Sequence, residues 1–163
     1  MIKLNSPARI TLSLDIVRKL PNSLHELSVI KQTISLHDEI TVEEAPQTTV
    51  LYENAPIEND IVHKMIKWVK KQHNIKKEVV VHIKKNIPLG SGLAGGSSNA
   101  AAVLKALNEL WQLKLDTEQL IALCRKIGQD CPYFIYGGTC YDTEAGGVVK
   151  PLPPLTKHYV LLI

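Results

Sequence analysis

Residues 88–107, PLGSGLAGGSSNAAAVLKAL, decide the fold of this chain. Four glycines and three serines fall within the nine positions from Gly90 to Ser98. Apolar residues then recur at helical spacing as far as Trp111. Glycines let backbone N–H groups approach an anion closely, and the first turn of a helix offers unpaired N–H groups and a positive dipole end. The stretch therefore predicts a phosphate-binding loop that opens a helix.

Three other types of loop can be tested against the residues at these positions. A Walker A loop needs a lysine after its second glycine, and that position is Gly96. A dinucleotide fingerprint matches at Gly90, Gly92 and Gly95, but the acidic Glu109 falls inside the following helix and not after the next strand. A tight glycine-rich turn with two serines as helix caps is the purely structural alternative. The phosphate cradle accounts best for glycines and serines occurring together.

Within that cradle, the hydroxyls of Ser97 and Ser98 are candidates to hold a phosphate oxygen or Mg²⁺. Asn99 is expected either to cap the helix or to touch a ligand.

The rest of the chain predicts strands and helices mixed without regular alternation, which indicates the α+β class. Alternation over residues 9–17 predicts a half-buried strand, and Asp116 with Gln119 predicts a capping box for a helix that ends near Gly128. The other expected elements are strands at 38–44, 48–53, 78–85, 133–141 and 158–163, and an amphipathic helix within 59–74.

Composition limits the class of protein. The chain has 163 residues, 45% hydrophobic and 21% charged, with a formal charge of +3. This favours one globular domain and an acidic small-molecule ligand, and argues against nucleic acid as a partner. Cys124, Cys131 and Cys140 form no C-x-x-C pair, and no zinc-ligand spacing occurs. Without a signal peptide or a membrane-length apolar run, we expect a cytoplasmic protein.

The loop PLGSGLAGGSSNAA resembles the second motif of the GHMP kinases, a superfamily that phosphorylates small-molecule alcohols with ATP. The GGSSNAA ending is most similar to the branch that acts on a cytidylated sugar alcohol in the non-mevalonate isoprenoid pathway. SPARITLSLDIV, LHELSVIKQTISLHDEITVEE and the stretch through GQDCPYF agree in order and spacing. The resemblance implies an N-terminal domain like the second domain of ribosomal protein S5, followed in the family by a ferredoxin-like domain that has no counterpart here.

The resemblance also implies roles for residues. Asp130, in GQDCPYF, would accept or orient the proton of the attacking hydroxyl, and His25 would hydrogen-bond the cytosine of the substrate. Mg²⁺ would lie at Ser98. The residues assigned to ATP are Lys85, Pro88, Gly90, Gly92, Gly95, Gly96, Ser97, Ser98 and Asn99.

Three positions depart from the family pattern. Arg9 stands where the family has its catalytic lysine, Thr11 replaces an asparagine expected to bind substrate, and Leu24 replaces the tyrosine that stacks on cytosine. Arg9 keeps a positive charge that can stabilise transferring phosphoryl oxygens, but its planar fork differs from an ammonium. Recognition of the nucleobase should weaken.

Two functions of different class follow. One is a kinase, seen here as its N-terminal domain over residues 1–163, that phosphorylates a hydroxyl of the methylerythritol moiety. The other is a truncated or degenerate homologue that binds nucleotide or a protein partner without turnover. The apolar ending HYVLLI is either a buried strand or the point where a second domain would begin. If it leaves an open edge or apolar face, a homodimer would cover it.

Overall fold

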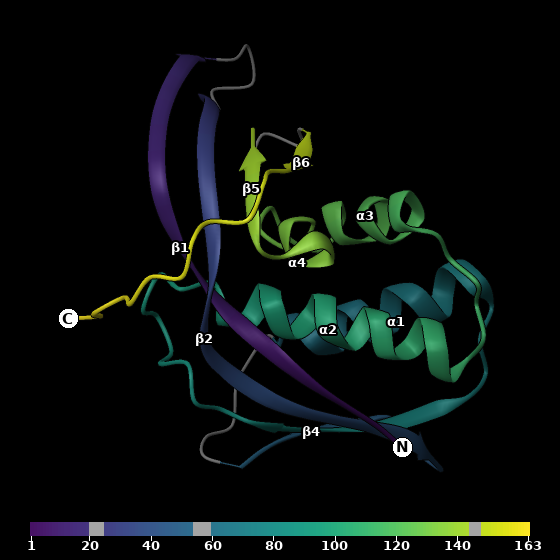
Figure 1. Ribbon diagram of the computed structural model, residues 1–163. Coiled ribbons are helices and arrows are strands. Elements are labelled where there is room, and N and C mark those ends of the chain that lie inside the picture. Colours follow the sequence, from purple (N-terminus) through teal and green to yellow (C-terminus); the bar gives the residue numbers. More distant parts are fainter. Residues whose placement is uncertain (20–24, 54–59, 144–147) are drawn as a thin grey trace.

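The computed structural model describes residues 1–19, 25–53, 60–143 and 148–163, in which a six-stranded sheet carries helices on one side (Figure 1). The predicted α+β class is confirmed. The strands are β1 Ile2–Lys19, β2 His25–Ala45, β3 Thr49–Tyr52, β4 Glu78–Lys84, β5 Thr139–Asp142 and β6 Val149–Pro151. The helices are α1 Ile61–His73, α2 Gly95–Leu110, α3 Thr117–Arg125 and α4 Tyr133–Tyr136.

The long strand β2 organises the sheet. It pairs antiparallel with β1 from one end to the other, so that Arg9 lies opposite Thr33. On its other edge, β2 pairs with β5 near its start and with β4 near its end, both antiparallel. β3 extends the sheet as the parallel neighbour of β4. The middle of β1, the end of β4 and the stretch before β5 therefore meet around the middle of β2.

The core lies between the sheet and helices α1 and α2, which pack side by side (Figure 1). Alternate positions of β4 point inward, and α1 contributes a buried stripe at helical spacing. α2 is buried on most of its circumference, which explains its run of alanines. The larger buried side chains that β2, β4, α1 and α2 contribute to this core are Ile40, Val42, Val62, Met65, Ile66, Val69, Val79, Val81, Ile83, Val103, Leu104 and Leu107.

Several predicted elements are correct. The helix within 59–74, the strand at 78–85 and the strand at 48–53 are present. The Asp116–Gln119 capping box is formed in both directions. α3 nevertheless ends at Arg125 with Lys126 as its C-cap, so the prediction of Gly128 as the cap was wrong.

The strand predicted at 133–141 was wrong in its first half. Pro132 has φ −56° and ψ −38°, which is helical, and it opens the short helix α4. Gly137 and Gly138 then take φ of +67° and +66°, a conformation that suits glycine and ends the helix before β5. The strand predicted at 158–163 is also absent, because those residues carry no regular secondary structure.

The predicted strand at 9–17 is part of β1, but its apolar side is largely uncovered. Leu12, Leu14 and Ile16 are 46%, 53% and 65% exposed. After β6 the chain crosses β2 and β1 (Figure 1), and a groove of about 790 Å³ lies between this segment and residues such as Ile10 and Leu12. The half-buried pattern predicted for this part of β1 was therefore wrong.

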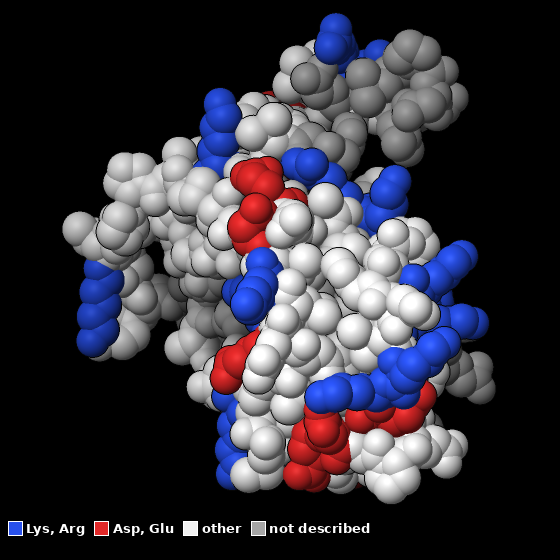
Figure 2. All heavy atoms as spheres, turned by 90° about the vertical axis from the view of Figure 1, so that its right-hand side faces the viewer, with Lys and Arg blue, Asp and Glu red and all other residues white. Residues whose placement is uncertain are grey.

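Charges of both signs share the face shown in Figure 2, with uncharged surface between them and no continuous basic stripe. In the part of the chain that the structure describes, no helix is long and apolar enough to cross a membrane.

Candidate active site

The glycine-rich loop connects β4 to α2 and depends on unusual backbone conformations. Gly90 and Gly92 have φ of +68° and +74°. Ala94, the N-cap of α2, also has a positive φ of 58° and makes no side-chain cap. The first N–H groups of α2 thus receive no capping side chain and are available to an external acceptor.

Gly95 is required for a different reason, which is close packing. A Cβ at this position would lie 3.0 Å from Ile87 Cγ2 and 3.1 Å from Lys85 Nζ. Neither approach is tolerated without movement of the neighbour. The first residue of α2 therefore sits directly against the segment that leaves β4.

That segment is fixed by Asp38, a fully buried carboxylate on β2. Its Oδ1 accepts hydrogen bonds from the backbone N–H groups of Asn86 and Ile87, both at 2.8 Å. Its Oδ2 pairs with the ammonium of Lys85. Asp38 thus holds both the start of the loop and the nearby lysine. The sequence analysis did not single out Asp38, although it is a charged residue at an inward position beside Ile40.

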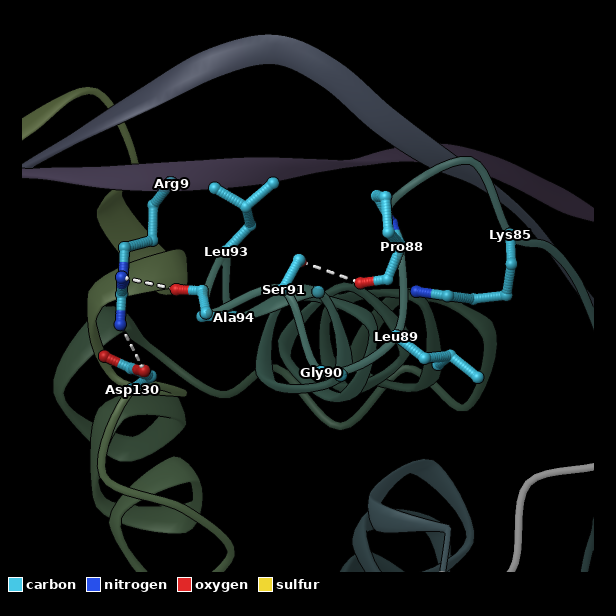
Figure 3. Close-up of a pocket in the computed structure, with 12 residues that line it drawn as sticks. Arg9, Lys85, Pro88, Leu89, Gly90, Ser91, Leu93, Ala94 and Asp130 are labelled. Atoms are coloured by element: carbon cyan, nitrogen blue, oxygen red, sulfur yellow. Dashed lines mark hydrogen bonds and ion pairs between the residues drawn. The ribbon is translucent and has the colours of Figure 1, made fainter. Parts of the chain in front are cut away.

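A pocket of about 310 Å³ opens over the loop (Figure 3). In the close-up, Lys85 lies at one side of the loop, and Arg9 with Asp130 lies at the other. The loop therefore runs between the Lys85 side chain and the Arg9–Asp130 pair. The lining residues are Arg9, Lys85, Pro88, Leu89, Gly90, Ser91, Gly92, Leu93, Ala94, Gly95, Gly96 and Asp130.

Arg9 joins β1 to the loop and to the candidate catalytic carboxylate. Its Nη2 lies 2.8 Å from Asp130 Oδ2, and its Nη1 donates to the carbonyl of Gly92 at 2.9 Å. The backbone N–H of Arg9 also donates to the carbonyl of Leu93 at 3.1 Å. The forked guanidinium therefore reaches two acceptors through two different nitrogens, in a geometry that its planar fork fixes.

A second cation reaches Asp130 from inside the domain. Lys31 on β2 is fully buried, and its Nζ donates to Asp130 Oδ1 at 2.7 Å and to Asp142 Oδ2 at 2.9 Å. The sequence analysis missed both Lys31 and Asp142. A signal was present, because Lys31 has the same strand parity as the buried Val29 and should therefore face inward.

These contacts decide the charge state of Asp130. Burial alone would raise the pKa of its carboxyl. The hydrogen bond and charge of Lys31, followed by those of Arg9, outweigh burial, so the pKa lies below its ordinary value of 3.8. The neighbouring thiol behaves in the opposite way, because burial raises the pKa of Cys131 to about 11. At neutral pH the site therefore holds a carboxylate and a neutral thiol.

The remaining residues predicted to bind the nucleotide, Ser97, Ser98 and Asn99, do not line the pocket. Ser97 lies half-buried in the first turn of α2, whereas Ser98 is buried and its Oγ accepts a hydrogen bond from Ser6 at 2.7 Å. Asn99 is also buried, and its Oδ1 has no hydrogen-bond partner among the described residues. Neither Ser98 nor Asn99 lines the pocket. The assignment of Mg²⁺ to Ser98 remains a prediction.

The residues predicted to bind the substrate are not gathered around the pocket. Thr11 is exposed on β1 opposite Lys31. His25 is exposed at the start of β2, eight residues from Thr33, which at strand rise is about 26 Å from the position of Arg9. Leu24 lies outside the described residues. Both substrate assignments remain predictions.

Mg²⁺ usually keeps several waters and is bound through substrate phosphates with one or two protein oxygens, so it needs no dense carboxylate cluster. Among the described residues there is no group of three or more histidine, cysteine, aspartate or glutamate side chains placed to hold a metal. The hydroxyl of Ser97, half-buried in the helix turn next to the pocket, is compatible with that mode.

Comparison with known proteins points to one family. Residues 60–138 match the family described as GHMP kinases N terminal domain. A 4-diphosphocytidyl-2-C-methyl-D-erythritol kinase of Geobacillus kaustophilus is 37% identical over 167 residues, covering 99% of this chain and 58% of that protein. The protein of the same name from Thermodesulfovibrio yellowstonii is 40% identical over 167 residues, covering 100% of this chain and 57% of its own length.

A solved structure shares the fold as well. The crystal structure of a 4-(cytidine 5'-diphospho)-2C-methyl-D-erythritol kinase superposes with a TM-score of 0.79 at 29% identity, over 93% of this chain and 55% of that one. The chain thus spans a little over half the length of the relatives it matches. The family match, the relatives and the shared fold identify the chain as a GHMP kinase N-terminal domain.

Proposed function

We propose that this chain supplies the nucleotide site and the reacting carboxylate of an ATP-dependent kinase acting on 4-diphosphocytidyl-2-C-methyl-D-erythritol. One observation carries the proposal: the carboxylate of Asp130 and the glycine loop at the start of α2 line the same pocket. The names of the relatives support the choice of acceptor.

The phosphates of ATP would lie over the loop. Free N–H groups at the start of α2 and the positive end of its dipole favour an anion there. Lys85 adds a positive charge at the pocket rim, held in place by Asp38. The positive φ of Gly90 and Gly92 shapes the loop, and neither carries a Cβ that would fill the space above it.

In the reaction, a bond forms between the acceptor hydroxyl oxygen and the γ-phosphorus of ATP, while the bond from that phosphorus to the bridging oxygen of ADP breaks. The hydroxyl proton leaves toward Asp130 or water. Phosphoryl transfer has a loose transition state in which the attacking hydroxyl has lost little of its proton. A carboxylate with a lowered pKa, such as Asp130, therefore suits orientation of the hydroxyl better than early proton removal.

Arg9 would stabilise the charge of the transferring group. It lines the pocket and already spans Asp130 and the carbonyl of Gly92, so it links the acceptor side to the nucleotide side. Fixed cations aimed at developing phosphoryl charge are among the strongest contributions to such catalysis. When bound, Mg²⁺ would neutralise phosphate charge, with the hydroxyl of Ser97 as a candidate to hold it.

The family resemblance alone assigns recognition of the cytidylated acceptor to His25 and Thr11 on the β1–β2 pair, which lie outside the pocket lined by Asp130. The stacking partner expected for cytosine is replaced by Leu24. An aromatic stack on a base contributes about 1–3 kcal/mol, so acceptor binding should be weaker than with a tyrosine at this position.

The experiment that tests the proposal is phosphoryl transfer from Mg·ATP to 4-diphosphocytidyl-2-C-methyl-D-erythritol, followed by phosphorus NMR. We expect a phosphorylated product with the chain as it is and none with Asp130→Asn. Glu39→Gln, at an exposed ion pair away from the pocket, is the matched control and should keep the product. Equal product from Asp130→Asn would refute the role of the carboxylate.

A second function, nucleotide binding without turnover, is favoured by one observation. Both oxygens of Asp130 are already engaged by cations, Oδ2 by Arg9 and Oδ1 by Lys31. Calorimetric titration with ATP and with ADP separates the two functions. Heat of binding without any product would favour the second, and no heat at millimolar nucleotide would argue against both.

A further inference from the structure

The most unusual charge outside the predicted site is Lys31. It is a fully buried lysine on β2, and its side chain faces the same inward side of the strand as the apolar Val29. Lysine is almost never fully buried unless it is paired, and an apolar side chain would fill such a position at lower cost. The groups that pair with the Lys31 ammonium should therefore indicate what the charge does.

The partners of Lys31 lie at two different places. Asp142 on β5 is buried beside it, with Oδ2 at 2.9 Å from Nζ. Asp130 lies at the pocket, with Oδ1 at 2.7 Å from the same nitrogen. Asp142 therefore provides a fixed buried anion for Lys31, and Lys31 in turn reaches the carboxylate that lines the pocket.

Asp130 is held from both sides by this arrangement. Arg9, which lines the pocket, takes Oδ2, whereas Lys31, which does not line it, takes Oδ1 from the interior. In these contacts, the two cations Arg9 and Lys31 face the two carboxylates of Asp130 and Asp142. Rotation of the Asp130 carboxyl would break one of these short contacts, so its plane is fixed relative to the loop.

We propose that Lys31 is a positioning residue, which fixes the orientation and ionisation of the Asp130 carboxylate from behind and is itself held by Asp142. This inference rests on the proposed function only in one respect, which is that the oriented Asp130 carboxylate acts on the hydroxyl of the acceptor. Its geometric content, that Lys31 controls Asp130, concerns the protein alone.

Other groups near this cluster must be considered in a titration. The ring of Tyr133 on α4 lies with its centroid 5.9 Å from Lys31 Nζ. Burial raises the pKa of Cys140, on β5, to about 11, and that of Cys131, next to Asp130, to a similar value. Neither thiol titrates in the acid range, so neither changes its charge while the Asp130 carboxyl is titrated.

The test is carboxyl carbon NMR of the whole chain as a function of pH, with the Asp130 signal assigned by its loss in Asp130→Asn. The main variant is the double change Lys31→Met with Asp142→Asn, which removes both buried charges together and leaves no buried carboxylate without its cation. We expect the pKa of Asp130 to rise by about 1–3 pH units, the size of an opposite charge removed at this distance. Lys84→Met, which removes an exposed lysine from the neighbouring strand, is the control and should leave the Asp130 signal unchanged.

An Asp130 pKa that is unchanged in the double variant would overturn the proposal, as would failure of this variant to fold, since Lys31 would then serve the core alone. Lys31→Arg keeps a cation and should restore a low pKa. Calorimetry with Mg·ATP separates this proposal from the proposed function. We expect nucleotide affinity to change less than about threefold in the double variant, whereas kcat, where turnover is measured, should fall at unchanged KM for ATP. A large loss of nucleotide affinity with an unchanged Asp130 pKa would refute Lys31 as a positioning residue and leave the nucleotide site standing.

Discussion

The loop that carries the candidate nucleotide site should depend on one buried carboxylate, Asp38. Replacing it with asparagine keeps the shape of the side chain and one oxygen that can accept from the N–H groups of Asn86 and Ile87. The other oxygen becomes an NH₂ group that faces the ammonium of Lys85, so a donor meets a donor where an ion pair stood. The change therefore removes a charge pair without removing volume.

The magnitude follows from burial. The Asp38 side chain is 0% exposed and that of Lys85 is 8% exposed, so solvent can compensate little. Breaking a buried pair by changing one partner costs about 3–5 kcal/mol. For a chain of this size each kcal/mol lowers Tm by about 2–4 °C, so the expected loss is roughly 6–20 °C.

The neighbouring residue provides a matched control. Glu39 pairs with Lys84 at 2.9 Å, one position along from each member of the first pair, but these side chains are 52% and 47% exposed. Solvent screens an exposed pair, so Glu39→Gln should lower Tm far less than Asp38→Asn. Thermal and urea unfolding of both variants checks the difference. Equal small losses in the two would show that burial does not give the Asp38 pair its strength, and the reasoning would fail.

Two further outcomes are expected. Arg9→Lys replaces the planar fork that contacts Asp130 and the carbonyl of Gly92 with a shorter ammonium, which is the group that the family resemblance places at this position. Phosphoryl transfer followed by phosphorus NMR should then show a higher kcat and an unchanged KM for ATP. The pKa of the Asp130 carboxyl lies below 3.8 in the folded protein, so the stability that its charge contributes should be constant from about pH 8 to 5. That stability should be lost only as pH falls through the folded-state pKa. The difference in unfolding free energy between the wild type and Asp130→Asn, measured as a function of pH, checks this.

The sequence predicted those parts of the protein in which local chemistry decides the structure. The loop followed from glycine density, the capping box from Asp116 and Gln119, and α1 from the spacing of its apolar residues. The stretch at 133–141 was misassigned because its apolar, aromatic composition favours a strand, whereas Pro132 and two left-handed glycines set the backbone. Composition is a weaker constraint than a fixed dihedral angle.

The partners of Asp130 were only half predictable, for a physical reason. Arg9 could be aligned with a family motif, so its place beside Asp130 followed from resemblance, and the structure puts the two 2.8 Å apart. Lys31 lies in one of the segments that resemble the family, but the resemblance assigns it no role. Its significance depends on the pairing of β5 with β2, which brings Asp142 beside Lys31 although the two are far apart in sequence. A buried charge is stable only when its partners are fixed in space, and those partners are set by topology. An inward lysine in a strand can therefore be noticed from alternation alone, but the carboxylate that it controls can be identified only once the sheet is known.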